Sequence, residues 1–303
     1  MLATGISYPL GIHADEEGIF VVTEIGQILR IAHGTGAVSL FADGLSNAMT
    51  LRRDADKNFY VHQPSLSRIT RVATITEPSG RVSGMIDSYL PVSNVRDIYV
   101  SGSKLYLQKT TTYNPQGGPV GLGGFEIRDL ASWGTIERTH HSFVRDAVGM
   151  SFDNSGGAFR DYLYIANFED NSIVRMDKDP ANPPIGKVRP FVSATQNSKL
   201  VRPNDVWVDP ANGNVWVSIQ GTDTATDGLI VLNSAGVEIA NYSALVDRPR
   251  KFGFDETHLY LANQGSNQVL RIDRATGAGL ASYAVPSPLS VAFDPATDTM
   301  YVG

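Results

Sequence analysis

The chain repeats one short pattern seven times, and this repeat restricts the fold more than any other feature. In each copy an apolar strand ends at an aspartate or serine, a short turn follows, and a second apolar strand begins, as in "KFGFDETHLYLAN". The anchor residues that end the first strands are Asp15, Asp54, Ser101, Asp153, Asp209, Asp255 and Asp294, at spacings of 39, 47, 52, 56, 46 and 39 residues. Such spacings are typical of β-propeller blades, whose period is about 40–50 residues.

Each repeat predicts four strands. Runs rich in Val, Ile, Phe, Tyr and Trp are interrupted by Asp, Asn, Gly and Pro, which is the pattern of strands separated by turns. Third strands such as "NSIVRMD" and "NQVLRID" and fourth strands such as "VRPFVSA" follow the repeated pair. We therefore expect an all-β fold, a β-propeller of four-stranded blades, as a single domain over residues 1–303.

Seven blades are the simplest interpretation, and six are the alternative. The seventh repeat stops at "TMYVG", after its second strand, so the last blade is incomplete in this chain. The segment "LATGIS" before the first repeat could supply an outer strand to that blade.

Composition narrows the partners and the chemistry. The net charge of −6 argues against a nucleic-acid partner. The absence of cysteine excludes disulfides and thiolate chemistry. No apolar stretch approaches the roughly 20 residues of a membrane span, and we expect a monomer. The compartment stays open, because a secreted or periplasmic chain loses its signal peptide.

Three stretches resemble known propeller families. "ANQGSNQVLRID" and "ANFEDNSIVRMD" resemble NHL-repeat propellers, and "RPNDVWVDPANGNVWVS" resembles a blade of the SMP-30 gluconolactonase family. "GIFVVTEIGQILRI" resembles a blade of streptogramin (virginiamycin) B lyase, a seven-bladed relative. The resemblance covers the whole chain at the level of blades. It implies enzymes that open a lactone by hydrolysis or elimination, although motifs shared by all blades specify a fold better than a chemistry.

Topology predicts which residues reach the propeller mouth. In a four-stranded meander, the starts of first strands and the ends of second strands lie on one face, which we call the mouth face. Five positions before each anchor residue lies the mouth column: Leu10, Met49, Arg96, Val148, Asn204, Arg250 and Leu289. Blades 3, 5 and 6 carry polar residues there. We predict that they bind a small, anionic molecule through Arg96, Asp97, Lys109, Asn204, Asp205, Arg250 and Lys251. The alternative is that the arginines and aspartates pair structurally between blades.

Candidate catalytic residues are two histidines and a glutamate. His62 ends a second strand, and His141 lies late in a fourth strand. A histidine is the natural proton acceptor at neutral pH. Glu24, at the end of the second strand of blade 1, is the third candidate. The alternative is that both histidines are ordinary surface residues, because no spacing motif joins them.

The metal site of the gluconolactonase family does not carry over. The resemblance implies a divalent cation held by a Glu, an Asn and an Asp in the mouth column, and only Asn204 matches. Leu10 stands at the Glu position and Arg250 at the Asp position, where a positive charge repels a cation. A different Ca²⁺ or Mg²⁺ site built from Glu24, Asp97 and Asp205 is the alternative.

The sequence thus predicts an enzyme that hydrolyses or eliminates a C–O bond of a lactone-like or ester-like metabolite. A non-catalytic propeller that binds a ligand or a protein is the alternative. Long loops favour the enzyme, since binding residues often lie on loops over a rigid scaffold. Three such loops are expected over the mouth face, at residues 110–124, 193–204 and 219–228.

Overall fold

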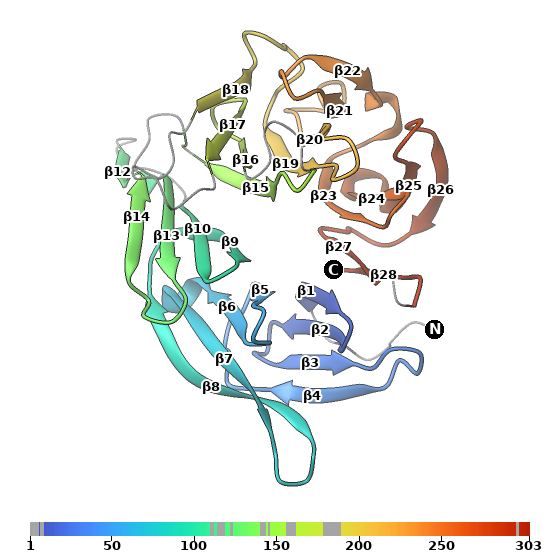
Figure 1. Ribbon diagram of the computed structural model, residues 1–303. Coiled ribbons are helices and arrows are strands. Elements are labelled where there is room, and N and C mark those ends of the chain that lie inside the picture. The colour runs from blue at the N-terminus through green and yellow to red at the C-terminus, as the bar shows by residue number, and fades with distance from the viewer. Residues whose placement is uncertain are drawn as a thin grey trace. The chain divides into compact units, whose positions relative to one another are not determined.

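The computed structural model of the chain (Figure 1) consists of two compact units. Unit 1 comprises residues 1–108, 126–136 and 292–303, and unit 2 comprises residues 109–125 and 137–291. The structure describes residues 6, 9–109, 112–113, 119–121, 124–139, 144, 146–155, 162–177, 189–294 and 297–303.

Unit 1 contains blades 1 and 2 and most of blade 3. Blade 1 consists of β1 (Pro9–Asp15), β2 (Gly18–Thr23), β3 (Ile28–Ile31) and β4 (Val38–Ala42). Blade 2 consists of β5 (Thr50–Arg53), β6 (Phe59–Gln63), the 3₁₀ turn η1 (Pro64–Leu66), β7 (Arg68–Thr76) and β8 (Val82–Pro91). Blade 3 consists of β9 (Val95–Ser101), β10 (Lys104–Lys109), β13 (Gly124–Asp129) and β14 (Thr135–Thr139).

Unit 2 contains blades 4, 5 and 6. Blade 4 consists of β15 (Ala147–Phe152), β16 (Tyr162–Asn167), β17 (Ser172–Asp177) and β18 (Arg189–Ser193). Blade 5 consists of β19 (Pro203–Val208), β20 (Val215–Ile219), β21 (Gly228–Leu232), β22 (Glu238–Asn241) and the 3₁₀ turn η2 (Ser243–Leu245). Blade 6 consists of β23 (Pro249–Phe254), β24 (His258–Asn263), the 3₁₀ turn η3 (Gln264–Ser266), β25 (Gln268–Asp273) and β26 (Gly279–Ala284). A separate hairpin pairs β11 (Thr112–Tyr113) with β12 (Pro119–Gly121).

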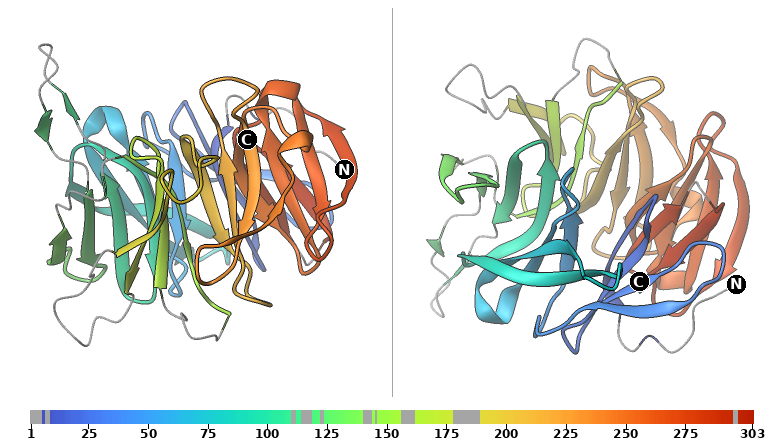
Figure 2. Two further views of the ribbon diagram at one scale, coloured as in Figure 1. Left: turned by 90° about the horizontal axis from the view of Figure 1, so that it is seen from above. Right: turned by 60° about the horizontal axis from the view of Figure 1, so that its bottom comes forward.

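Every blade is an antiparallel meander, which confirms the predicted all-β propeller of four-stranded blades. The described residues form six four-stranded sheets, each with its strands in chain order, and two two-stranded sheets, β11–β12 and the pair of β27 (Val291–Asp294) and β28 (Thr299–Val302). Within the described residues the last blade thus has two strands, as the sequence predicted. The strands of each sheet twist relative to one another, as sheet β23–β26 shows in Figure 2. Of the segment "LATGIS", only Ile6 is described, and it packs against a core cluster of blade 1 together with Tyr301.

The hydrophobic core lies between neighbouring blades. In unit 1 the rings of Phe20 and Phe59 lie 4.7 Å apart and Phe41 closes the cluster, so blades 1 and 2 share one core. In unit 2, Tyr164 and Val217 belong to one cluster that joins blades 4 and 5. Burying each such side chain contributes about 1.5–3 kcal/mol. Second strands are apolar on both faces because each of them packs between two blades.

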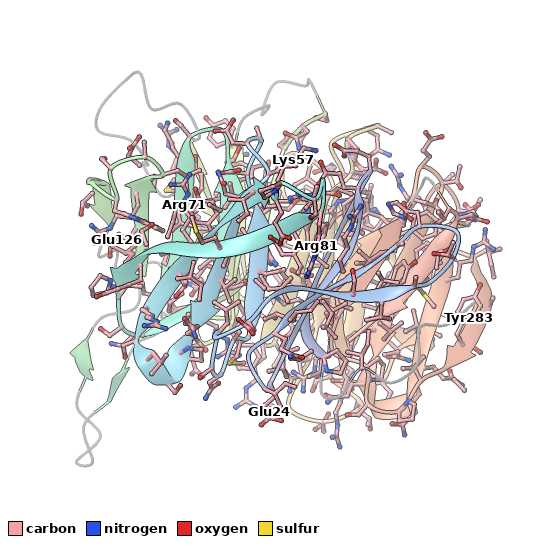
Figure 3. All side chains as sticks on the ribbon, turned by 90° about the horizontal axis from the view of Figure 1, so that it is seen from below. Glu24, Lys57, Arg71, Arg81, Glu126 and Tyr283 are labelled. Atoms are coloured by element: carbon pink, nitrogen blue, oxygen red, sulfur yellow. The ribbon has the colours of Figure 1, made fainter. Side chains whose placement is uncertain are left out.

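The anchor aspartates stabilise the turns that follow the first strands. The Asp209 Oδ1 atom accepts the N–H of Ala211 at 2.8 Å, and the Asp255 Oδ1 atom accepts the N–H of Thr257 at 2.7 Å. These side-chain turns replace a backbone turn and fix the path between the strands. They lie at the end opposite the mouth face: in unit 1, Glu24 of the mouth face and Lys57 of the anchor side lie at opposite edges (Figure 3). No helix within the described ranges is long and apolar enough to cross a membrane.

The phrase shared by blades 4 and 6 is part of this frame. The amide oxygens of Asn167 and Asn263 accept the backbone N–H groups of Asp146 and Asp247, at 3.2 and 2.7 Å. Each asparagine ends a second strand, and each partner precedes a first strand of the same blade. The repeated asparagine therefore fixes where the chain enters the blade.

Candidate functional site

The mouth column coincides with a β-bulge in four blades. The register of first and second strands shifts between Pro9 and Gly11, between Ala147 and Gly149, between Pro203 and Asp205, and between Pro249 and Phe252. The residues inside these shifts are Leu10, Val148, Asn204, and Arg250 with Lys251. A bulge adds an unpaired residue and re-aims its side chain, and bulges are frequent next to active sites. The mouth column, which was found by counting back from the anchor residues, therefore coincides with an irregular strand pairing in these four blades.

Two glutamine side chains orient the guanidinium of Arg250 in unit 2. Its Nε atom donates to the Gln264 Oε1 atom at 2.7 Å, and its Nη1 atom donates to the Gln220 Oε1 atom at 2.6 Å. The Gln264 Nε2 atom in turn donates to the Ser287 hydroxyl at 3.1 Å. The Arg250 carbonyl accepts the Ser218 hydroxyl at 2.8 Å. Two neutral amides therefore hold the guanidinium in one orientation.

The geometry around Arg250 agrees with the topological argument for the mouth face. Gln220 and Gln264 each directly follow a second strand, whereas Arg250 lies at the start of a first strand. Their side chains meet, so these strand ends lie on the same face of unit 2.

Asp205 is fixed by the backbone of its neighbours. It is 9% exposed; its Oδ1 atom accepts the N–H of Val206 at 3.0 Å, and its Oδ2 atom accepts the N–H of Phe252, in the next first strand, at 3.1 Å. A Cβ atom at Gly149 would lie 2.6 Å from the Asp205 Cα atom. The glycine therefore permits first strands of neighbouring blades to approach closely. Asn204, on the same strand as Asp205, is also buried. The backbone N–H of Lys251 donates to the Leu289 carbonyl at 3.4 Å.

Unit 1 brings together His62 and Asp97. His62 is 3% exposed, and its Nδ1 atom has no hydrogen-bond partner within the described residues. Burial lowers the pKa of His62 to about 4, although the negative charge of Asp97 acts in the opposite direction. The ring is consequently neutral at neutral pH, the state that a proton acceptor requires.

Asp97 is also bound by an arginine that the sequence did not single out. The Arg52 Nη2 atom lies 3.3 Å from Asp97 Oδ1 and 3.4 Å from Asp97 Oδ2. The Asp97 Oδ1 atom also accepts the N–H of Ile98 at 2.8 Å. Arg52 and Asp97 thus form an ion pair, and the Asp97 carboxylate interacts electrostatically with the neutral His62 ring. We call these three residues the Asp97 cluster.

The remaining candidates are scattered. Arg96 and Glu24 are exposed, and Lys109 is half-buried at the end of β10. His141 lies outside the described residues, so its predicted role stays a prediction. Of the three predicted loops, residues 110–124 are described only in part, whereas 193–204 and 219–228 are fully described.

The residues present do not fit a divalent metal at the mouth column. Arg250 stands at the position of a family ligand, and its donors point to glutamine oxygens. Among the residues that the structure describes, no three His, Asp or Glu side chains gather in a way that could hold a metal ion. We therefore derive no step through a metal.

Sequence reasoning missed the partners of the candidate residues. Arg52 lies in a predicted strand and belongs to no recognisable motif. Gln220 and Gln264 lie in two loops that differ in length. One signal was available, since both glutamines directly follow the second strands of neighbouring blades.

Several solved structures share the fold of this chain. The chain is similar to virginiamycin B lyase from Staphylococcus aureus over 100% of its own length and 93% of that chain, with a TM-score of 0.64 and 13% identity. It is similar to a luciferin-regenerating enzyme over 92% and 95% of the two chains, with a TM-score of 0.61 and 16% identity. It is also similar to a chain of a nidogen–laminin complex over 92% and 94%, with a TM-score of 0.57 and 16% identity.

No protein-family model and no curated protein sequence matches the chain. At these identities the likeness establishes the fold, the β-propeller that streptogramin B lyase also has, and not the reaction.

Proposed function

We propose that the chain is an enzyme that binds an anionic small molecule on its mouth face and cleaves a C–O bond of a lactone or ester. The orientation of Arg250 by two glutamine oxygens is the observation that carries this proposal. A guanidinium held in one geometry binds a carboxylate, or the oxyanion that develops when an ester is attacked, with little loss of side-chain entropy.

The surroundings of Arg250 support binding of an anion. Two of its side-chain partners are the neutral amides of Gln220 and Gln264. Lys251 adds a second positive charge inside the same bulge. The bulge places both residues opposite a single residue of β24, Ala262.

The Asp97 cluster supports a role in proton transfer. His62 is neutral and buried and interacts electrostatically with the Asp97 carboxylate, and a carboxylate stabilises the imidazolium that forms when a histidine accepts a proton. Virginiamycin B lyase and the luciferin-regenerating enzyme are named as enzymes on this fold, which supports a catalytic function over a purely structural one.

The proposal is tested by turnover of a panel of lactones and linear esters, half of them carrying a carboxylate, with and without chelator. We expect activity on carboxylate-bearing substrates. Arg250→Ala is expected to lower kcat/KM by about 10²–10³-fold, the usual effect of removing an oxyanion donor, and Arg250→Lys is expected to restore part of it. Arg189→Ala removes an exposed arginine of β18 and is the matched control.

Two outcomes would contradict the proposal. Unchanged activity in Arg250→Ala would show that Arg250 does not bind the anion. Unchanged activity in His62→Gln would show that His62 is not a proton acceptor. Binding of carboxylates without turnover, lost in Arg250→Ala, would favour the alternative of a ligand-binding propeller. Binding of a protein partner in place of any small molecule would favour a scaffold, as in the nidogen–laminin complex.

A further inference from the structure

Unit 2 contains a cavity away from Arg250, at the outer part of blade 5. Its volume is about 280 Å³, and three segments line it: residues 198–201, 225–228 and 241–243. The first two belong to the loops predicted to overhang the mouth face. The Gly221 N–H donates to the Val201 carbonyl at 3.1 Å, which joins these loops. The cavity would hold roughly nine water molecules at bulk density, the size of a small organic molecule.

Asp227 is the buried acidic residue of this cavity. It is 5% exposed, and its Oδ2 atom accepts the N–H of Arg248 at 2.6 Å. Its Oδ1 atom is buried and has no hydrogen-bond partner among the described residues. A buried oxygen without a donor is costly, and burial raises the pKa of this carboxyl above its ordinary value. The site therefore lacks one hydrogen-bond donor.

The charges around Asp227 favour a positively charged donor. Asp223 and Asp247 both interact with Asp227 as like charges, against one attractive interaction with Arg248. Lys199 also lines the cavity, but its ammonium pairs with the Glu238 carboxylate. The local balance is therefore negative.

We propose that this cavity binds a small organic ammonium ion. The ammonium group donates to Asp227, and its carbon chain lies against Val201 and Ala225, which line the same cavity. The hydroxyl group of Ser243, which accepts one backbone N–H, supplies a further acceptor for the ammonium N–H groups. A metal ion fits less well, because no three His, Asp or Glu side chains within the described ranges form a metal-binding group.

The experiment compares two probes of similar size, butylammonium and 1-butanol. Binding is followed by amide chemical-shift changes in the protein during titration. We expect butylammonium to shift the amides of residues 198–201 and 225–228 with a dissociation constant at least tenfold lower than that of 1-butanol. The reason is that a charge-assisted hydrogen bond is about twice as strong as a neutral one.

Asp227→Asn is the decisive variant. Asparagine keeps an oxygen that can accept the Arg248 N–H, so the fold should persist while the charge is lost. We expect this variant to bind butylammonium about tenfold more weakly, which corresponds to one charge-assisted hydrogen bond. Asp56→Asn, which neutralises an exposed aspartate of unit 1, should leave binding unchanged.

Gly228→Ala tests the cavity without touching the charge. A Cβ atom at this position would lie 3.1 Å from the Ser243 Oγ atom and 3.3 Å from the Ile219 Cδ1 atom, so it narrows the cavity wall. We expect weaker binding of butylammonium in this variant too. Equal binding of the two probes, no shift with butylammonium, or full binding by Asp227→Asn would each overturn the proposal.

Discussion

Asp97 and Asp205 occupy the same position of two first strands, one in each unit, and both are buried. Each Oδ1 atom accepts the N–H of the following residue, Ile98 or Val206. Beyond this shared bond the two sites differ. Asp205 accepts a second backbone N–H, from Phe252 of the next first strand, whereas Asp97 contacts the Arg52 guanidinium and interacts electrostatically with His62.

The difference shows that one position of the repeat can stabilise the packing of blades in one place and interact with titratable side chains in another. A carboxylate that binds backbone donors of two blades stabilises their packing. The same carboxylate beside an arginine and a neutral histidine has side-chain partners that a proton or a ligand can perturb. Repeats constrain the first role because every blade needs it, whereas the second role depends on residues that only one blade pair carries.

The largest effect is expected for Asp205→Ala. Two buried backbone N–H groups would lose their acceptor, and each loss costs about 1–3 kcal/mol. We expect the free energy of unfolding in urea to fall by about 2–4 kcal/mol. Asp56→Ala, at an exposed position, is the control, and a loss no larger than in this control would show that Asp205 is not a frame residue.

The pH dependence of the free energy of unfolding tests whether His62 is buried and neutral in the folded chain. Because its pKa is about 4 in the folded chain against an ordinary 6.5, the unfolded chain binds more protons between these values, and stability falls as the pH falls through that window. The full shift corresponds to about 3 kcal/mol. Urea unfolding at pH 7 and pH 4 should show this loss in the wild type, reduced by about that amount in His62→Gln. Equal losses in both would contradict the buried, neutral histidine.

Asp97→Asn should have a smaller effect on stability than Asp205→Ala. Asparagine still accepts the Ile98 N–H but no longer pairs with Arg52, so we expect a loss of about 1 kcal/mol at pH 7. Because the Asp97 charge acts to raise the pKa of His62, its removal should lower that pKa further. An NMR titration of the His62 ring checks this, and an upward shift would be inconsistent with the Asp97 cluster.

The smallest effect is expected for Arg52→Gln. The Arg52 side chain is 27% exposed and its contacts to Asp97 are 3.3–3.4 Å long, so the pair contributes about 0.5 kcal/mol and is screened by salt. The loss in urea unfolding should shrink at 1 M NaCl. Arg189→Gln, which alters an exposed arginine of β18, is the matched control, and a salt-independent loss would argue for a packing role of Arg52.

Much of the frame could be predicted from the sequence because its signals are local. The anchor aspartates cap turns two or three residues away, and strand alternation needs only neighbouring residues. The mouth column was also predictable, since counting back from an anchor residue stays within one strand. Burial of His62 could not be predicted, because it depends on blade 3, more than 30 residues further along the chain.

The sequence by itself determined the period, the four strands of each blade, the incomplete last blade and the strand ends that face one way. Only the tertiary structure decided that Arg250 is oriented by Gln220 and Gln264, that Asp97 pairs with Arg52, and that Asp227 lies in a cavity with one carboxylate oxygen unpaired. The physical reason is the distance along the sequence between the residues that interact. Turns and strand alternation arise from contacts within a few residues, whereas bulges, ion pairs and cavities arise where blades distant in sequence pack together.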